Sequence, residues 1–298
     1  MADMTATTMA TWVPAVLSKS ATMTYRTECV LAPKMDRRWE PELGVGRGNI
    51  INIPGFTQNT TATARSTFGT GAAVTFDAVT EGQTQLQVNK MAYKAFRVPC
   101  EMAPQAMALY FQELTKGIGQ ACQIYLDGQL ASDNSNGLDA LTAIGTDNVD
   151  ITLDTILLAQ ETLNLVSAPT KDRFFVVSPG SQTSLFNIDS ARNSLYATSM
   201  GTLKGDVGAG SVTLGNNQTF LGKFLTFEFW MSNNLESGVS GKKNAAFQRE
   251  AIALCVQQDI KFERGTNIAD GVFYETIGWL SFGHKMVKSG FGNEVDGR

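Results

Sequence analysis

The stretch Asp150–Pro179, DITLDTILLAQETLNLVSAPTKDRFFVVSP, carries the clearest local signals for the fold of this chain. Asp150 or Thr152 can cap a helix, because either side chain can accept a hydrogen bond from the first helical turn. The apolar residues of this helix recur at helical spacing, and they are Leu153, Ile156, Leu157, Ala159 and Leu163. Residues 173–177, RFFVV, predict a short buried strand. Ser178-Pro179 predicts the start of a second helix, since proline suits the first helical turn.

Residues 104–131, upstream of this stretch, predict the clearest helix of the chain. Pro104 suits its first turn, and at 1.5 Å per residue the segment would be roughly 40 Å long. Its apolar residues recur at spacings of three and four, and they are Met107, Tyr110, Phe111, Leu114, Ile118, Ala121, Cys122, Tyr125 and Leu126. Gly117 and Gly119 interrupt the helix at a cost of about 1 kcal/mol each, which close approach of another element would justify.

Residues 49–98 predict a long β-hairpin. Asn49–Pro54 is a short β-branched run ended by proline, and Thr84–Val98 predicts one strand with alternating parity. Between these runs the chain is rich in Thr, Ala and Gly, and its few large apolar residues include Phe56, Phe68, Val74 and Phe76. Because an isolated two-stranded ribbon is marginally stable in water, we expect a hairpin that projects and packs on something else.

Residues 1–48 lack a convincing period and predict an extended arm with one short helical turn near Trp12. Trp39 lies in a polar, turn-rich context of the same segment. Both tryptophans would be costly to leave in water. Each therefore needs a docking surface, on its own chain or on another.

Downstream of Pro179 the pattern continues with loops and strands. Residues 197–222 are rich in glycine and predict a loop, and Lys223–Met231 predicts one strand. Residues 245–264 and 271–289 predict two further strand-rich blocks. Because no internal repeat is detectable, we interpret the whole chain as a mixed α+β protein.

The composition excludes several classes of protein. Of 298 residues, 43% are hydrophobic and 17% are charged, and the net charge is −4. The chain is therefore too apolar to be mostly disordered, and it is not a polycation whose main task is to neutralise phosphate. A low charge also suits a surface that meets other protein, because interface cores are depleted of charged residues.

Motifs for catalysis, cofactors and metals are not found. The sequence has no phosphate-binding loop, dinucleotide fingerprint or nucleophile elbow. The one histidine, His284, is expected to be structural, and the four cysteines, which match no zinc spacing, are expected to be reduced: Cys29, Cys100, Cys122 and Cys255. We therefore expect no cofactor, no metal and no enzymatic activity. No secretory signal or membrane span is recognised, so cytosolic synthesis is the default.

The order of these segments along the chain, rather than any single motif, resembles that of a known family. The pieces are an arm, Asn52-Ile53-Pro54 with a Thr/Gly-rich hairpin, the helix at 104–131, Leu153–Leu163, Arg173–Pro179, Phe229–Leu235, Ala245–Phe247 and Gln257–Arg264. This order resembles that of the major capsid proteins of tailed double-stranded DNA phages, which have the Hong Kong 97-type fold. The resemblance covers most of the chain.

The resemblance implies four parts: an N-terminal arm at 1–48, an extended hairpin loop at 49–98, a peripheral domain with a long spine helix at 99–137 and 241–298, and an axial domain at 138–240. It also implies assembly of many copies, in the host cytoplasm, into pentamers and hexamers of an icosahedral virion shell around DNA. A portal is an implied partner. A separate scaffolding protein is expected because no scaffold-like N-terminal extension is visible, and a decoration protein is left open.

Six residues are candidates for contacts between subunits: Trp12, Trp39, Phe56, Arg65, Phe68 and Phe76. For the five aromatic residues, packing within the same subunit is the open alternative. Part of the capsid family cross-links its loops through a lysine, but no lysine occurs between Lys34 and Lys90. Arg65 cannot replace that lysine, because a guanidinium stays protonated. We therefore expect a shell without covalent cross-links.

Other classes of function fit the sequence less well. An encapsulin-type compartment would share the fold and enclose enzyme cargo, whereas a tail-tube or fibre protein would form tubes. A soluble enzyme would need a pocket with convergent polar groups, which the sequence does not indicate. Contact with packaged DNA is expected to be weak and non-specific, since a net charge of −4 provides no strong basic surface.

Overall fold

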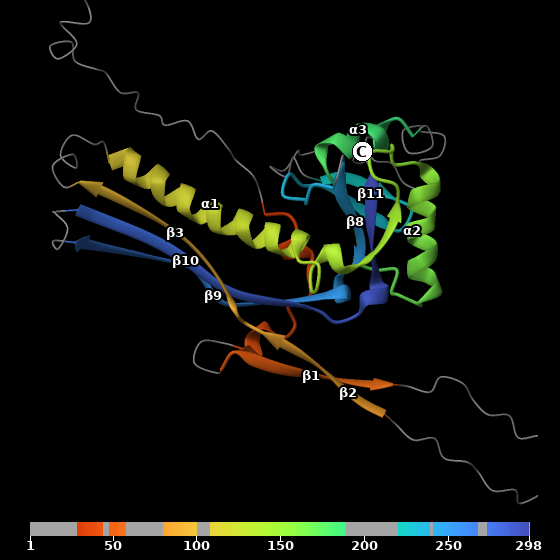
Figure 1. Ribbon diagram of the computed structural model, residues 1–298, viewed down its shortest axis with the longest axis horizontal. Coiled ribbons are helices and arrows are strands. Elements are labelled where there is room, and N and C mark those ends of the chain that lie inside the picture. The colour runs from red at the N-terminus through yellow and green to blue at the C-terminus, as the bar shows by residue number, and fades with distance from the viewer. Residues whose placement is uncertain are drawn as a thin grey trace, which may run out of the picture.

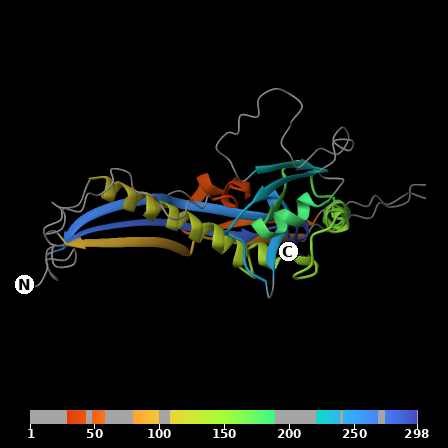
Figure 2. The same cartoon turned by 90° about the horizontal axis from the view of Figure 1, so that it is seen from above.

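The computed structural model of this chain describes residues 29–43, 48–57, 80–99, 108–188, 220–238, 241–267 and 273–297. These residues form an elongated unit, in which a long helix runs along a three-stranded sheet, and a compact unit at one end of it (Figure 1). Seen from above, the helix and the three strands extend together away from the compact unit (Figure 2). The predicted mixed α+β class is confirmed.

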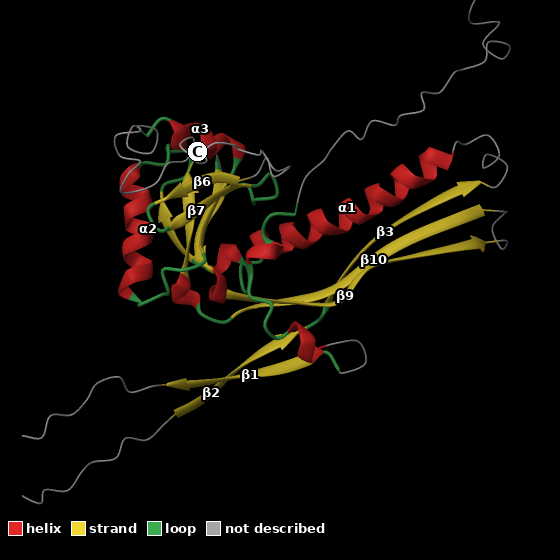
Figure 3. Ribbon diagram, turned by 180° about the vertical axis from the view of Figure 1, so that it is seen from behind, coloured by secondary structure: helices red, strands yellow, loops and turns green. Residues whose placement is uncertain are grey.

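The compact unit is built on a six-stranded sheet with the order β4-β11-β8-β5-β7-β6. Its strands are β4 (Thr142–Gly145), β5 (Arg173–Val177), β6 (Phe220–Phe224), β7 (Phe227–Met231), β8 (Lys242–Gln248) and β11 (Gly292–Gly297). The pairs β11–β4 and β5–β7 are parallel, and the other pairs are antiparallel. Helices α2 (Leu153–Leu165) and α3 (Pro179–Phe186) accompany this sheet (Figure 3).

Local sequence signals begin both helices where they were predicted. Of the two candidate caps for α2, Thr152 is the one observed, since its hydroxyl accepts a hydrogen bond from the backbone N–H of Thr155 at 3.4 Å. At α3 the Ser178 hydroxyl accepts from the N–H of Ser181 at 3.2 Å, and Pro179 occupies the first turn. Each cap satisfies a backbone donor that the helix itself leaves unpaired.

Strand β5 is buried along its whole length, as predicted. Phe175 and Val177 pack with buried residues of α2 and α3, whereas Phe174 and Val176 pack on the opposite face with buried residues of the elongated unit. The side chains of a strand alternate between its two faces. The five-residue strand therefore contributes to two hydrophobic cores and joins the two units.

The elongated unit consists of α1 (Ala108–Ser132) and an antiparallel sheet with the order β3-β10-β9. These strands are β3 (Lys90–Pro99), β9 (Ile252–Asn267) and β10 (Phe273–Met286). The helix buries the apolar residues Ile118, Cys122, Leu126 and Leu130. It packs closely on the sheet at Gly278 of β10, where a Cβ atom would clash with Ile118. The close approach is thus made possible by a glycine of the sheet.

The predicted hairpin at 49–98 is partly wrong. Strand β1 (Ile50–Thr57) pairs with β2 (Thr80–Gln87), and this antiparallel pair is hereafter called the ribbon. The chain then leaves the ribbon at Val88-Asn89 and enters β3, which pairs with β10. Thr84–Val98 is therefore two strands in two sheets. A two-residue break keeps the alternation in phase, which is why one strand was expected.

A second predicted strand, Lys223–Met231, is also two strands. Strands β6 and β7 pair antiparallel around a turn at Leu225-Thr226, where Leu225 has a φ of 56°. Phe220–Gly222, predicted to be part of a loop, belongs to β6. Strands β8 and β11 join the six-stranded sheet, so the predicted domain boundary at 241 does not coincide with a boundary between sheets.

Short 3₁₀ helices connect the larger elements: η1 (Ala32–Lys34), η2 (Glu40–Leu43), η3 (Leu138–Ala140), η4 (Arg249–Ala251) and η5 (Ser289–Phe291). The predicted turn near Trp12 and the predicted first turn at Pro104 lie outside the described residues. Among the helices of the described ranges, none combines the length and the apolar character needed to cross a membrane.

Candidate assembly surface

Within the described residues, the ribbon packs on the rest of the chain at its end near β3. Near β3 its side chains Ile53 and Leu86 are buried together with Leu43, Val88, Ala253 and Cys255, which come from η2, the end of the ribbon and β9. Farther along, Pro54, Gly55, Glu81 and Gly82 are all exposed. Because an isolated two-stranded ribbon is marginal in water, this exposed half is a candidate contact surface.

In the part of the chain that the structure describes, the three-stranded sheet also has an exposed face. Lys90 of β3 points to α1, since its ammonium group donates to Gln129 and Asp133 at 2.9 and 2.8 Å. Met91 and Tyr93 therefore lie on the opposite face, and they are 54% and 70% exposed. Tyr93 stands directly opposite Trp279 of β10 in the strand register.

We call Met91, Tyr93 and Trp279 the outer sheet patch. Lys261 of β9 lies over the Trp279 ring at 5.4 Å and borders the patch with a positive charge. Large exposed apolar side chains in a group are a usual mark of a protein interface, and Tyr and Trp are enriched in interface cores. The outer sheet patch is therefore a candidate contact surface.

A second exposed apolar group lies on α2. It consists of Leu157, Leu158, Leu165 and Val166, and we call it the α2 patch; Leu165 is 77% exposed. Opposite these residues, Ile156, Ala159 and Leu163 are buried against the six-stranded sheet. The helix thus has apolar residues on both sides, as expected of an element between two protein surfaces.

The residues predicted to make subunit contacts are only partly described. Trp39 is half-buried against the same hydrophobic cluster as Ile53 and Leu86 of its own chain. The Arg38 guanidinium lies 5.1 Å from the centre of the Trp39 ring. Phe56 lies in β1 opposite Glu81, and only its backbone is described. Four others lie outside the described residues: Trp12, Arg65, Phe68 and Phe76. Their contacts between subunits stay predictions.

Neither patch was predicted as a contact surface, and Leu157, predicted to belong to the apolar stripe of its helix, is 43% exposed. In Thr84–Val98, Met91 and Tyr93 alternate with Leu86, Val88, Ala92 and Phe96, which are the residues expected to form the apolar face of the strand. Alternation places them on one face, but sequence alone does not show whether that face is covered. On α2, Leu158 and Leu165 are seven residues apart, which puts them on one side of the helix. That spacing could have predicted a second apolar side of the helix from the sequence.

A buried polar cluster holds the end of α1 to the sheet. His284 Nε2 lies 3.1 Å from Asp133 Oδ2, which also accepts from Lys90 at 2.8 Å. Burial, reinforced by the Lys90 charge, lowers the pKa of His284 to about 4. Burial would raise the pKa of Asp133, but hydrogen bonds from Lys90, Ser135 and Asn136 lower it to about 2. The histidine is therefore a neutral structural group near pH 7.

A second polar cluster lies beside the six-stranded sheet. The Lys243 ammonium group pairs with Asp139 and lies 3.3 Å from Glu294. Burial raises the pKa of Glu294 to about 7, and the nearby Asp139 and Asp296 act in the same direction against the effect of Lys243. These residues tie η3, β8 and β11 together.

Neither cluster has the form of a catalytic site. Each is a set of ion pairs between packed elements, without a nucleophile paired to a base. Within the described ranges, no group of three or more His, Cys, Asp or Glu side chains could hold a metal ion. Three of the cysteines, Cys29, Cys122 and Cys255, are free thiols, and Cys100 lies outside the described residues.

Comparison with known proteins finds similarity in structure alone. No family model and no curated protein matches the sequence. A solved structure from Mycobacterium phage Che8 matches with a TM-score of 0.69 and 18% identity, over 95% of this chain and 97% of that chain. The capsid structure of Cyanophage P-SCSP1u matches with a TM-score of 0.63 and 12% identity, over 98% and 94%.

A further match comes from the mature capsid of bacteriophage PhiM1, with a TM-score of 0.65 and 9% identity over 96% of this chain and 92% of that chain. In all three cases nearly the full length of both chains is aligned. The chain therefore has the same fold as these phage structures, and the similarity includes both units.

Proposed function

We propose that this chain is a structural, non-enzymatic major capsid protein that assembles with many copies of itself into the head of a tailed phage. One observation carries the proposal: the chain shares its fold along nearly its whole length with phage capsid structures. The proposed shell is icosahedral, consists of pentamers and hexamers, and encloses double-stranded DNA in the virion. Assembly would take place in the host cytoplasm.

The exposed surfaces support this role. The ribbon, the outer sheet patch and the α2 patch lie on different parts of the molecule. The two patches expose large apolar side chains, and the half of the ribbon away from β3 is exposed. A subunit of a closed shell contacts several neighbours through different surfaces, since such contacts are heterologous. In the proposed arrangement the exposed half of the ribbon lies on a neighbouring subunit.

We assign the elongated unit to the peripheral part of the shell and the compact unit to the axial part. In this proposal the axial part contains residues 138–240 together with β8 and β11, since these strands belong to its sheet. The peripheral part keeps α1 as its spine helix. The arm at 1–48 and the loop at 49–98 complete the subunit.

The proposed partners are a portal and a separate scaffolding protein, with a decoration protein as a further candidate. DNA contact is proposed to be weak and non-specific, because the net charge is −4. The shell is proposed to be non-covalent, since no lysine occurs between Lys34 and Lys90. Boiling intact particles in detergent should therefore release single subunits on a denaturing gel, whereas a ladder of linked subunits would contradict this.

The alternative is an encapsulin-type compartment with enzyme cargo. The solved structures described above come from phages, which favours the phage head. Electron microscopy of the purified chain, expressed with and without its scaffolding protein, tests the proposal. Closed shells of uniform size support it, and soluble monomers or tubes under all conditions contradict it. Nuclease-resistant DNA in particles from infected cells, without co-purifying enzyme, separates the phage head from the compartment.

A further inference from the structure

Residues 29–36 run across the junction between the two units, and we call this segment the strap. It contains only the short helix η1, yet Leu31 is fully buried and Met35 is 2% exposed. Both side chains belong to one hydrophobic cluster with Leu126 of α1 and Phe247 of β8. The strap therefore packs against the elongated unit and the compact unit at the same time.

One end of the strap is held by a buried carboxylate of α1. Asp127 is fully buried and accepts hydrogen bonds from three consecutive backbone N–H groups, those of Val30, Leu31 and Ala32 at 2.6, 3.3 and 3.1 Å. Successive N–H groups of this kind form a concave site for an anion. The Cys29 thiol donates to the same carboxylate at 3.0 Å, and the amide of Asn234, which follows β7 in the compact unit, donates at 3.3 Å. A single carboxylate thus connects α1, the strap and the compact unit.

The other end of the strap contacts the compact unit and the start of β9. The Lys34 ammonium group lies 3.3 Å from the centre of the Trp230 ring of β7, which is a cation–π contact. The N–H of Asp36 donates to the carbonyl of Ile252 at 3.1 Å, and the N–H of Leu254 donates to the carbonyl of Asp36 at 2.8 Å. Strand β9 begins at Ile252, where the chain passes from the compact unit into the elongated unit.

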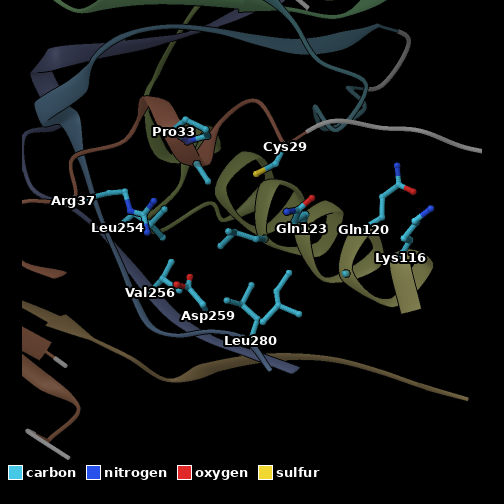
Figure 4. A pocket seen from close by; sticks show the side chains of 14 residues that line it. Cys29, Pro33, Arg37, Lys116, Gln120, Gln123, Leu254, Val256, Asp259 and Leu280 are labelled. Atoms are coloured by element: carbon cyan, nitrogen blue, oxygen red, sulfur yellow. The ribbon is translucent and has the colours of Figure 1, made fainter. Parts of the chain in front are cut away.

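The strap also forms one wall of a groove of about 880 Å³, whose other walls come from α1, β9 and β10. Figure 4 shows Cys29 and Pro33 of the strap at this groove, together with Gln123 of α1 and Leu254 of β9. Among the described residues, this side of the strap faces a groove rather than packed side chains. Movement of the strap on this side therefore leaves the helix and the strands intact.

We propose that the strap holds the compact unit in one orientation relative to the elongated unit, and that Asp127 keeps the strap closed. Proteins open locally in segments smaller than the whole fold. When the strap opens, side chains that pack against both units are withdrawn, and each unit keeps its own hydrogen-bonded sheet. The outer sheet patch and the α2 patch lie on different units, so the strap determines how these two surfaces are placed relative to each other. The inference concerns the single subunit and does not rest on shell formation.

Asp127→Asn in unassembled, full-length subunits tests the first part of the inference. The amide keeps the size of the side chain but replaces one acceptor oxygen with a donor that faces the N–H groups of the strap. Because losing a hydrogen bond to a charged group shifts an equilibrium by about tenfold or more, alkylation of Cys29 by iodoacetamide should be about tenfold faster. Mass spectrometry measures the rate at each cysteine. The buried Cys122 and Cys255 report unfolding of the units and should keep their rates.

Hydrogen exchange separates opening of the strap from a change in thiol chemistry. Burial and the Asp127 charge both raise the pKa of the Cys29 thiol, so removing the charge by itself makes this thiol more reactive. Opening also speeds the exchange of the backbone N–H groups of residues 30–32, which a change in pKa alone leaves unaltered.

The orientation of the two units is measured as the distance between nitroxide labels at Gly265 of β9 and Leu165 of α2. Both positions are exposed, and the labels are attached through ketone-bearing residues so that the native cysteines remain. Asp127→Asn should shift or broaden the distribution of this distance. Asp133→Asn is the matched control, because it changes a carboxylate of the same helix whose partner Lys90 lies within the elongated unit. The control should alter neither the distance nor the rate at Cys29.

Lys34→Met gives a second test that leaves the buried carboxylate in place. It removes the contact with Trp230, and it should change the distance in the same direction and speed alkylation of Cys29 by about two- to fivefold. An unchanged distance in folded Asp127→Asn subunits would overturn the inference, as would equal acceleration at Cys29, Cys122 and Cys255. If Asp127→Asn does not fold, an unchanged distance in Lys34→Met overturns it.

Discussion

The compact unit and the elongated unit differ in how completely they cover their sheets. In the compact unit both faces of β5 are covered, with Phe175 on the side of α2 and α3 and Phe174 on the side of α1. In the elongated unit α1 covers one face of the sheet, and the other face keeps Tyr93 70% exposed. The difference teaches that the compact unit covers both faces of its central strand β5 and keeps its exposed apolar group on α2, whereas the elongated unit leaves a face of its sheet exposed.

The largest expected effect comes from a substitution in the core of the compact unit. Phe175 is fully buried, and its ring stacks on that of Phe229 with 4.8 Å between centroids. Phe175→Ala leaves a cavity that neighbouring strands cannot close, and it should lower the free energy of unfolding by about 3–5 kcal/mol. Urea denaturation of unassembled subunits measures it. A loss below about 1 kcal/mol would show that this core is not closely packed.

The next effect is the pH dependence of stability, to which the two polar clusters contribute with opposite sign. The folded-state pKa of His284 is lowered from 6.5 to about 4, so between these values the unfolded chain binds more protons and stability falls as pH falls. The pKa of Glu294 is raised from 4.5 to about 7. In that window the folded chain binds more protons, so this group makes stability fall as pH rises.

The two clusters therefore oppose each other between pH 4.5 and 6.5, and single variants separate them. Each shift corresponds to up to roughly 3 kcal/mol, at about 1.4 kcal/mol per pKa unit. His284→Gln should lose the stability decrease toward low pH, and Glu294→Gln should lose the decrease toward pH 7. Denaturation curves at several pH values report both slopes. The inference for either cluster fails if its variant keeps the slope of the unaltered protein.

A smaller effect tests where the ribbon is joined to the sheet. A Cβ atom at Gly283 of β10 would collide with the backbone of Gln87 and Val88. Gly283→Ala should cost about 1–3 kcal/mol, as overpacking usually does, and should speed hydrogen exchange in residues 80–87. Gly265→Ala is the matched control in β9, because no atom lies within 4 Å of its added Cβ. Similar effects of both variants would contradict a specific junction.

The smallest effect on the stability of the single subunit is expected for the outer sheet patch of the elongated unit. Tyr93→Ala removes an exposed ring, so the free energy of unfolding should change by less than about 0.5 kcal/mol. If the outer sheet patch contacts a neighbour, the concentration of free subunits that coexists with shells should rise about tenfold for each 1.4 kcal/mol lost. Sedimentation of assembly mixtures measures this. Unchanged assembly would exclude Tyr93 from the contacts.

The sequence predicted the elements well where the cause is local. Thr152 and Ser178-Pro179 begin their helices because a cap needs only a side chain and the next turn. Residues 173–177 form a buried strand because all five positions suit a covered sheet. The helix at 104–131 is confirmed over 108–131, although Tyr125, assigned to its apolar stripe, is 46% exposed.

What only the tertiary structure decided concerns partners that are distant in sequence. The alternation of Thr84–Val98 is the same whether its neighbour is β1, β10 or both, so the break at Val88-Asn89 had no local signal. The capture of residues 29–32 by Asp127 joins positions almost a hundred residues apart. The sequence by itself determined where α2 and α3 begin and that residues 173–177 form a buried strand, because periodicity and capping act within a few residues. The tertiary structure alone decided which faces stay open, because a face is covered or exposed only through what packs against it.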